Sequence, residues 1–200
     1  MSKKDRLSDY KARRDFRRSP EPSGRRKGGN DRRFVIQQHD ATSMHWDFRL
    51  EIDGVLVSWA VPKGPSTDPR DKRLAVRTED HPVDYLDFEG VIPEGEYGAG
   101  AVIVWDTGRY RNLRGEKGTD ACSMSDCLDQ GQLEVYLEGR KLTGGYALVH
   151  ARTGGEDKNW LLVKMDDDQA DARRRPTSTE PESVLSGRTV REVADVEETD

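Results

Sequence analysis

The sequence predicts a mainly β protein: a compact single-domain antiparallel β-barrel of about eight strands, with a short N-terminal helix and a disordered acidic C-terminal tail. The first observation behind this prediction is a series of short apolar runs that have the period of strands, with almost no helical period between them. The second is that Gly, Pro or Asp clusters separate most of these runs. The expected strands cover residues 34–39, 45–52, 55–61, 73–78, 101–108, 132–139, 144–151 and 159–165.

The charge of the chain is distributed unevenly and divides it into three parts. Of 200 residues, 33 are Lys or Arg and 38 are Asp or Glu, which gives a net charge of −5. Residues 1–33 carry 13 basic and five acidic side chains, residues 34–165 carry 15 and 22, and residues 166–200 carry five and 11. We therefore expect a basic N-terminal arm over 1–33, a barrel over 34–165 and a disordered acidic tail over 166–200.

Two segments outside the expected strands have features of their own. Residues 5–16 have apolar positions that allow a short helix, and a loop rich in Pro, Gly and Arg follows them. Residues 111–130 are polar and lack either period, which predicts a surface excursion between strands. Cys122 and Cys127 lie in this excursion, and because their spacing is not that of a zinc half-site, we expect free thiols in a loop.

The sequence gives no sign of a membrane protein. No stretch approaches the roughly 18 consecutive apolar residues of a membrane span, and the first residues contain no apolar stretch typical of a secretory leader. We expect a soluble cytoplasmic protein with no membrane partner.

Three of the four histidines lie in two short windows, and this clustering is the main indication of function. In the strand that begins at His45, alternation places Trp46, Phe48 and Leu50 on one face and His45, Asp47, Arg49 and Glu51 on the other. Ionisable groups in a row are unfavourable unless they are paired, coordinate a metal or face a wet cleft.

The residue types in this row predict a metal site. Imidazole and carboxylate together suit Mn, Fe or Zn, and His45 and Asp47 on one strand are within reach of one ion. His39 ends the preceding strand, so a hairpin brings it to the same ion. Arg49, one pleat beyond Asp47, then lies where a planar bidentate donor can hold an anion bound to that metal. His81 is a further candidate, whereas we interpret His150, at the end of an apolar strand, as structural.

Other interpretations of the same residues remain open at this point. A single His-x-Asp pair on a strand is most often a surface ion pair. His45 and Asp47 with a distant His81 or His150 also match the facial triad of non-haem Fe(II) oxygenases, which likewise occupy β-barrels. A third possibility is a non-catalytic barrel that binds single-stranded nucleic acid through Arg49 and the basic arm.

The basic arm has two interpretations as well. Such a composition is usually a solvated charged tail. Alternatively, its cations neutralise phosphates and help bring a nucleic acid to the core. Asp15 and Glu21 are acids within this basic context, and they become site residues if the arm folds back onto the barrel.

Several long motifs, in the right order, resemble the 3′-phosphoesterase module found in bacterial DNA ligase D and as free-standing proteins in bacteria and archaea. They are RRDFRRSPEP (13–22), FVIQQH (34–39), HWDFRLEIDGVLVSWAVPKGP (45–65), KRLAVRTEDHPVDYLDFEGVIPEGEYGAG (72–100) and WLLVKM (160–165). The resemblance runs from about Tyr10 to Met165. It implies a small β-barrel that uses Mn²⁺ to trim and dephosphorylate 3′ ends before gap filling and sealing.

The resemblance also assigns roles to individual positions. It implies that His39, His45 and Asp47 hold the Mn²⁺ ion and that Arg49 and His81 contact the scissile phosphate. It places Tyr85, Arg14, Asp15 and Glu21 among the residues needed for activity, and Gln37, Lys63, Arg73 and Glu79 among supporting polar positions. The segment around the cysteines and the acidic tail have no counterpart in the family that we can place.

The leading hypothesis is therefore an Mn²⁺-dependent phosphoesterase that heals 3′ ends in DNA repair by non-homologous end joining. The resemblance implies two activities, a 3′-ribonucleoside phosphodiesterase and a 3′-phosphomonoesterase. Its expected substrate is a DNA primer-template that ends in a 3′-ribonucleotide or a 3′-phosphate, at the nucleoid. Because the sequence shows no polymerase or ligase module, we expect any ligase and polymerase to act in trans.

Overall fold

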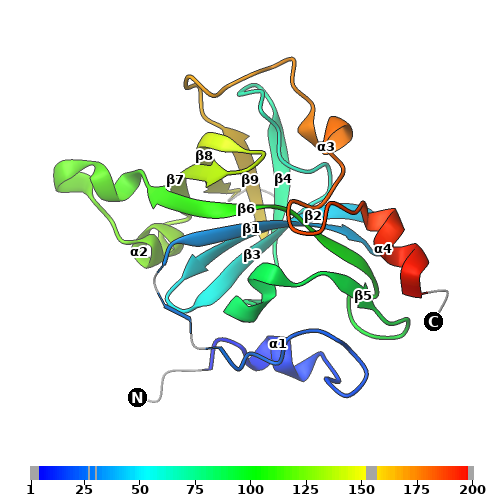
Figure 1. The fold of residues 1–200 in the computed structure, drawn as a ribbon. Coiled ribbons are helices and arrows are strands. Elements are labelled where there is room, and N and C mark those ends of the chain that lie inside the picture. The colour runs from blue at the N-terminus through cyan, green and yellow to red at the C-terminus, as the bar shows by residue number, and fades with distance from the viewer. Residues whose placement is uncertain (1–4, 27, 30, 152–156, 198–200) are drawn as a thin grey trace.

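The structure is a computed structural model, and it describes residues 5–26, 28–29, 31–151 and 157–197. Eight antiparallel strands follow one another in the order β1-β2-β3-β4-β9-β8-β7-β6. Pairing between β1 and β6 closes this sheet into a barrel (Figure 1). A short strand, β5, pairs with the beginning of β6 on the edge opposite β1. The bounds are β1 (Arg33–Asp40), β2 (Met44–Ile52), β3 (Val55–Val61), β4 (Lys72–Arg77), β5 (Gly90–Ile92), β6 (Gly100–Asn112), β7 (Gln132–Gly139), β8 (Thr143–His150) and β9 (Asn159–Lys164).

The barrel confirms the fold class and all eight expected strands, and it adds β5. Its interior is filled by every second side chain of the strands, because successive side chains in a strand point to opposite faces. Trp46, Phe48 and Leu50 of β2 belong to this interior cluster, as do the fully buried Trp59 and Trp105. Each such side chain contributes roughly 1.5–3 kcal/mol or more through the apolar area it removes from water.

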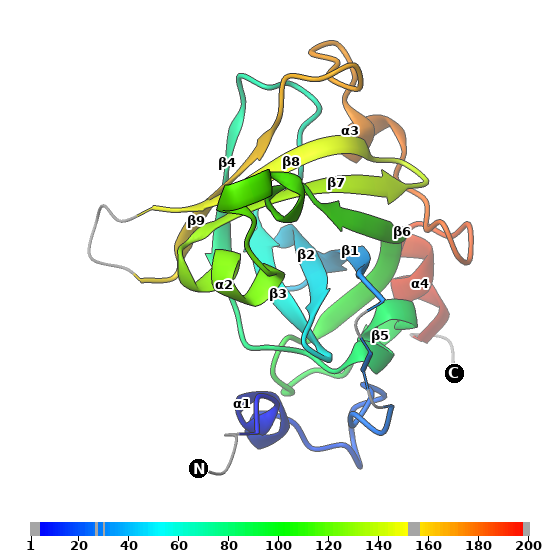
Figure 2. The ribbon, with the colours of Figure 1, turned by 90° about the vertical axis from the view of Figure 1, so that its left-hand side faces the viewer.

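A second apolar cluster lies on the outer face of the barrel and determines where the functional side chains lie. Val35, Leu56 and Val104 project outward from β1, β3 and β6, and they pack with Tyr10 and Tyr85. Tyr10 belongs to helix α1 (Ser8–Ala12), which confirms the expected N-terminal helix in a shorter form, and Tyr85 to the 3₁₀ helix η1 (Val83–Asp87). Figures 1 and 2 show the N-terminal segment below the strands in both views.

The structure differs from the expected disordered tail over residues 166–197. Helix α3 (Pro176–Thr179) and helix α4 (Val190–Glu197) lie in this segment. The indole of Trp105 donates to the carbonyl oxygen of Glu180 at 2.8 Å, and Val190 and Val193 pack on Ile103 of β6. These few apolar contacts are tertiary, so the charged composition of the segment did not reveal them; residues 198–200 lie outside the described residues.

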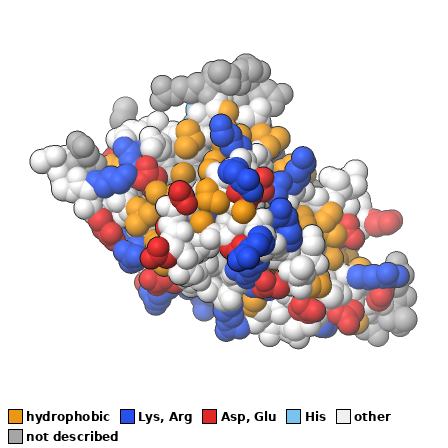
Figure 3. All heavy atoms as spheres, turned by 90° about the horizontal axis from the view of Figure 1, so that it is seen from above, with side chains coloured by type: hydrophobic (Ala, Val, Ile, Leu, Met, Phe, Trp, Pro, Cys, Tyr) orange, Lys and Arg blue, Asp and Glu red, His pale blue; other side chains and the backbone are white. Residues whose placement is uncertain are grey.

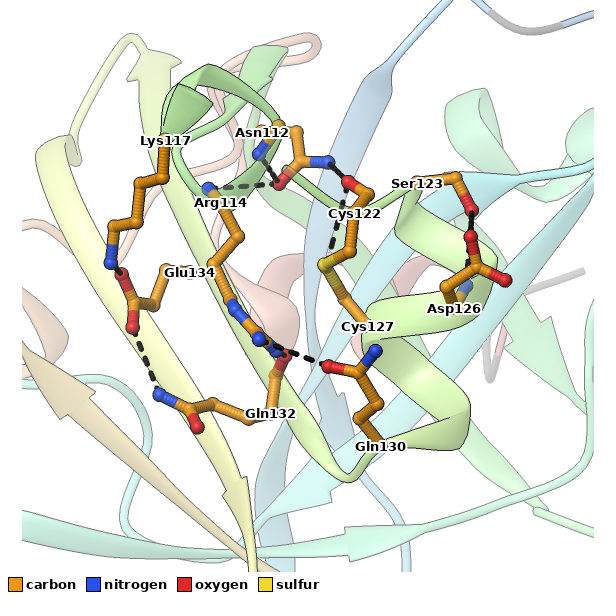
Figure 4. The surroundings of a disulfide bond; sticks show 11 residues. Asn112, Arg114, Lys117, Cys122, Ser123, Asp126, Cys127, Gln130, Gln132 and Glu134 are labelled. Carbon is orange, nitrogen blue, oxygen red and sulfur yellow. Dashed lines mark hydrogen bonds and ion pairs between the residues drawn. A yellow bond between two sulfur atoms is a disulfide. The ribbon is translucent and has the colours of Figure 1, made fainter. Parts of the chain in front are cut away.

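The expectation of free thiols is wrong, because Cys122 and Cys127 form a disulfide with their Cα atoms 5.9 Å apart (Figure 4). The excursion lies between β6 and β7 as expected, and it contains η2 (Arg114–Glu116), η3 (Gly118–Asp120) and helix α2 (Met124–Asp129). Ser123 caps α2 by accepting from the backbone N–H of Asp126 at 3.1 Å. A helix of six residues is too short to give a visible period, which explains why the sequence did not predict it.

None of the described helices is both long enough and apolar enough to span a membrane.

A buried carboxylate joins two parts of the barrel wall. Asp106 of β6 is fully buried and accepts hydrogen bonds from the backbone N–H groups of Thr107, Arg140, Lys141 and Leu142, at 2.9–3.0 Å. The last three belong to the turn between β7 and β8. Burial raises the pKa of Asp106 although these donors act in the opposite direction. The side chain therefore fixes a turn whose donors have few other partners.

Replacing Asp106 with Ala should lower the free energy of unfolding by about 3 kcal/mol, because several backbone donors lose their acceptor. Urea denaturation followed by circular dichroism measures the change. Asp166→Ala is the matched control, since Asp166 is exposed and its loss should change stability by less than about 0.5 kcal/mol. A similar small change in Asp106→Ala would contradict this role of the carboxylate.

Candidate active site

The hairpin of β1 and β2 brings three potential metal ligands together on the outer face of the barrel. His39 and His45 are directly opposite each other in the antiparallel register, and Asp47 lies one pleat further along β2. The Nδ1 atom of His39 lies 3.5 Å from one Asp47 oxygen, and the Nε2 atom of His45 lies 3.6 Å from the other. The ligand atoms of all three residues lie within 4.8 Å of one another. The structure thus places the three predicted metal ligands in one cluster.

Backbone carbonyl groups orient both imidazole rings toward Asp47. The carbonyl oxygen of Gly98 lies 2.8 Å from Nε2 of His39, and that of Ser43 lies 3.0 Å from Nδ1 of His45. A carbonyl can only accept, so these two ring nitrogens carry the protons and the other two present lone pairs to the cluster. Metal-bound histidines are held in the same way in proteins, which fixes the tautomer and the ring orientation.

The charge of Asp47 completes a donor set that fits a divalent metal. Burial alone would raise the pKa of Asp47, but the charge of Arg49, 3.0 Å away, outweighs it and holds the pKa well below its usual range. Asp47 is therefore ionised. Two neutral imidazoles and one carboxylate suit Mn²⁺, Fe²⁺ or Zn²⁺, and three protein ligands leave positions open for a substrate.

The guanidinium of Arg49 lies next to these ligands with one nitrogen unused. Its Nη2 contacts Asp47 at 3.0 Å, and its Nε donates to Oε1 of Gln37 at 2.8 Å. The amide of Gln37 donates in turn to the carbonyl groups of Tyr85 and Phe88. The Nη1 atom is buried and has no hydrogen-bond partner among the described residues. Arg49 is thus held firmly while it keeps free donors for another acceptor.

The N-terminal segment and η1 form the other side of the site. Glu21 accepts from Nε of Arg14 and from the hydroxyl of Tyr85, both at 2.8 Å. Arg14 also donates to Glu79 at 3.0 Å, and its Nη2 lies 3.4 Å from Nε2 of His81. These buried ion pairs join residues far apart in the sequence, so the arm is part of the wall of the site.

His81 is neutral in this environment. Its Nδ1 donates to the carbonyl oxygen of Glu79 at 2.9 Å, which leaves the lone pair on Nε2. Burial, together with the nearby charges of Arg49 and Arg14, lowers the pKa of His81 well below its usual value. The ring packs edge-on against Tyr85 with centroids 4.9 Å apart. The unprotonated Nε2 of His81 therefore faces the guanidinium group of Arg14.

All these groups surround one cavity of about 320 Å³. Most of the predicted site residues line it, namely Arg14, His39, His45, Asp47, Arg49, Glu79, His81 and Tyr85. Its lining residues come mainly from β1–β3 and residues 78–85, with Arg14 from the N-terminal segment, which lies at the bottom of Figure 1. On the upper face of the molecule, side chains of both charges are interspersed with apolar ones (Figure 3). Because the clustered ionisable groups line this cavity, it is the candidate active site.

Comparison with known proteins agrees with this geometry. The sequence profile of the "DNA Ligase D 3'-phosphoesterase domain" matches residues 37–150. The chain is a member of the DNA ligase D 3′-phosphoesterase domain family. This finding confirms the family that the motifs predicted.

Curated relatives of this family member are similar over most of its length. The multifunctional non-homologous end joining protein LigD of Pseudomonas aeruginosa is 47% identical over 189 residues, which cover 92% of the chain. The protein of the same name from Mycolicibacterium smegmatis is 44% identical over 171 residues, 84% of the chain. A Mycobacterium tuberculosis relative, described as a multifunctional non-homologous end joining DNA repair protein, is 45% identical over 163 residues, 80% of the chain. The chain spans only 20–22% of the length of these relatives.

Five residues that the family resemblance names are not part of the cavity lining. Glu21 and Gln37 bind lining residues, as described above, whereas Asp15, Lys63 and Arg73 lie further away. Asp15 binds Arg17 with two hydrogen bonds of 3.0 Å, in the turn that leads to Glu21. Lys63 is exposed just after β3, and Arg73 of β4 donates to Asp71 at 3.1 Å. Asp15 therefore supports the turn that carries Glu21 into the site, while the roles of Lys63 and Arg73 stay predictions.

The structure brings in other residues that the sequence did not predict. Tyr97 and Gly98 line the cavity from the connection between β5 and β6, and Thr78 and Ala60 line it from the barrel side. Gly98 has a φ of +79°, which glycine adopts without strain. The only available signal was an aromatic residue within a glycine-rich connection, and its contacts depend on the folded barrel.

The ligand set of the oxygenase hypothesis does not form among the described residues. The metal-ligating cluster contains His39 rather than His81 or His150. His81 points Nε2 toward Arg14, and Nε2 of His150 lies 2.9 Å from the carbonyl oxygen of Asp157 on a different part of the barrel. His150 lies outside the metal-ligating cluster, and its structural role stays a prediction.

The protein should bind one Mn²⁺ per chain, and Asp47→Asn or His39→Ala should weaken this affinity by at least about tenfold. The affinity should also fall as the pH is lowered, because protonation of either imidazole removes a ligand lone pair. Calorimetric titration with Mn²⁺ at a series of pH values tests both points. His150→Ala is the matched control; an affinity that depends on His150 but not on Asp47 would contradict the assignment.

Proposed function

We propose that this protein is an Mn²⁺-dependent phosphoesterase that heals the 3′ ends of nucleic acids. The observation that carries the proposal is the pairing, in one cavity, of a His-His-Asp ligand set with the buried Arg49, whose Nη1 has no acceptor among the described residues. A buried donor without a partner is unfavourable, and a phosphate oxygen beside the metal site would satisfy it. The family described above is named for the same class of reaction.

In this proposal, His39, His45 and Asp47 hold the ion, which supplies Lewis-acid polarisation of a phosphate oxygen when bound. Arg49 donates to the other phosphate oxygens, where negative charge grows in the transition state. Because Gln37 and Asp47 already fix the guanidinium, little reorganisation is needed at the moment of reaction. A single preorganised donor of this kind typically contributes about 100- to 1,000-fold to the rate.

His81 would act as the general acid that protonates the leaving oxygen of the ester. The resting ring is neutral because burial and two arginines disfavour the imidazolium. A bound phosphate adds negative charge next to the ring and opposes the effect of Arg49 and Arg14, so substrate binding favours protonation of Nε2. As a water molecule attacks phosphorus and the bond to the leaving oxygen breaks, the imidazolium can donate this proton to that oxygen, while the attacking water gives up a proton to the solvent.

Tyr85, Glu21 and Arg14 would position these groups. The guanidinium carbon of Arg49 lies 4.9 Å from the centre of the Tyr85 ring, and the hydroxyl of Tyr85 is fixed by Glu21. Arg14 faces the cavity beside His81 and adds a second positive charge for the phosphate. The arm thereby contributes to the active site.

The substrate we propose is a DNA primer-template that ends in a ribonucleotide or a 3′-phosphate. The resemblance noted above links the family to both ends, and the relatives are described as proteins of non-homologous end joining. A healed 3′-hydroxyl end is what a polymerase or a ligase requires. We therefore propose that the protein prepares ends for a polymerase and a ligase.

Purified protein with Mn²⁺ should shorten a labelled primer that ends in one ribonucleotide and should dephosphorylate a primer with a 3′-phosphate. Asp47→Asn should lose at least about 1,000-fold of this activity, because the ion and Arg49 both lose their carboxylate partner. Arg49→Lys should lose about 100-fold, because an ammonium cannot reproduce the planar fork. Gel analysis of the labelled primers measures these rates.

Two outcomes of this assay would contradict the proposed function. Full activity of Asp47→Asn would remove the metal assignment. Tight binding of the primer without turnover in any divalent metal would favour the non-catalytic binding barrel instead. Circular dichroism of the variants checks that they retain the fold.

Replacing Glu21 with Gln should lower kcat about tenfold or more, because Arg14 and the hydroxyl of Tyr85 lose their shared charged acceptor. Deletion of residues 1–33 should lower turnover further. Asp9→Asn, on the exposed face of α1, is the matched control and should leave kcat unchanged. If the deletion changes only binding and its salt dependence, the arm is an electrostatic tether and not part of the active site.

A further inference from the structure

Tyr97 is the only aromatic residue among the large apolar side chains that the structure describes as exposed. Its exposed fraction is 48%, yet it lines the cavity of the candidate active site. An aromatic ring left in water gains little from folding. Its position at the mouth of a cavity therefore points to a ligand that would cover it.

The ring is held in place before any ligand binds. Its hydroxyl accepts a hydrogen bond from Nη1 of Arg13 at 2.9 Å. The guanidinium carbons of Arg13 and Arg14 lie 5.0 and 5.5 Å from the ring centre, within the range of cation–π attraction. Glu79 binds both arginines, at 3.2 and 3.0 Å. Little side-chain entropy is lost when such a preordered ring receives a ligand.

The ring of Tyr97 is connected both to the metal-ligand cluster and to His81. The next residue, Gly98, binds the metal ligand His39 through its carbonyl oxygen at 2.8 Å. On the other side, Arg14 joins the ring to His81. Because Tyr97 and Arg49 line the same cavity, a planar group on Tyr97 and a phosphate on Arg49 can belong to the same end of a nucleic acid.

We propose that Tyr97 is a stacking platform for the nucleobase at the reacting 3′ end; this inference rests on the function proposed above and deepens it. Every base offers a π-face, so such a platform binds ends of any sequence. Arg13 and Arg14, whose guanidinium carbons lie over the ring, supply positive charge for the adjoining phosphates, and the exposed part of the ring remains available to a base. The protein then recognises a nucleotide through its base, its phosphate and the metal together.

The test compares two primer-templates that differ only in the last nucleotide, which carries a 3′-phosphate and either a base or an abasic sugar. Binding is measured by fluorescence anisotropy in the Asp47→Asn background, where turnover is blocked. We expect Tyr97→Leu to weaken binding of the base-bearing end about tenfold relative to the abasic end. Tyr97→Phe keeps the ring and should retain the preference for the base.

Turnover by the protein with an intact Asp47 gives a second measurement. Tyr97→Leu should raise KM for the base-bearing end about tenfold and change kcat much less. Leu74→Ser is the matched control, because Leu74 is similarly exposed at 45% but lies on β4 outside the cavity lining. This control should change neither constant.

Three results would overturn the inference. The first is an equal loss of affinity for both ends in Tyr97→Leu, which would mean that the ring only supports the cavity wall. The second is no loss of affinity for either end in this variant. The third is that the protein with Tyr97 binds the base-bearing end no more tightly than the abasic end. Failure of the proposed function is a separate result. In that case neither end is hydrolysed in Mn²⁺, while the binding measurement still decides whether Tyr97 recognises a base.

Discussion

The buried carboxylate of Asp47 is the group on which the arrangement of the site depends. An ionised carboxylate away from water is unfavourable by several kcal/mol unless it is paired and hydrogen-bonded. Arg49 provides this pairing, while His39 and His45 flank the carboxylate, and all three come from the β1–β2 hairpin. The register of the hairpin fixes their positions, so a slip of one residue would turn the whole set into the apolar interior. The packing of Trp46, Phe48 and Leu50 inside the barrel therefore also holds the polar row outside.

The position of this row on the outer face explains why the protein needs a second layer. A barrel wall exposed to water could not keep Asp47 and Arg49 desolvated, and electrostatic interactions are stronger where water is excluded. The N-terminal segment and η1 supply the cover through Tyr10 and Tyr85, which pack against the outside of the strands. Glu21 and Glu79 then tie Arg14 to this cover. The apolar contacts and the ion pairs depend on each other, which explains why the described part of this basic segment packs against the barrel.

The sequence predicted those features that depend on local periodicity. Alternation in residues 45–52 identified both the interior face and the polar face of β2, and the proximity of His39 to His45 predicted a shared site. It did not predict the disulfide between Cys122 and Cys127, the order of residues 166–197 or the place of Tyr97. The order of residues 166–197 and the place of Tyr97 depend on contacts between segments far apart in the chain, such as Val190 on Ile103. The disulfide joins cysteines only five residues apart, but its formation depends on the local backbone geometry around α2, about which composition carries no information. The interactions of Glu21 were within reach only through the family motifs, since nothing local indicates its partners Arg14 and Tyr85.

The balance of charge in the cavity gives a physical reason for a metal ion. Three carboxylates, those of Asp47, Glu21 and Glu79, are paired with three guanidinium groups, those of Arg14, Arg49 and the partly exposed Arg13, while His81 is neutral. The paired set therefore has no net charge and by itself attracts a phosphate only weakly. A divalent cation on His39, His45 and Asp47 makes the set positive, so that the same cavity attracts the anion. The ion and the phosphate should thus bind cooperatively, because their opposite charges attract where water is largely excluded.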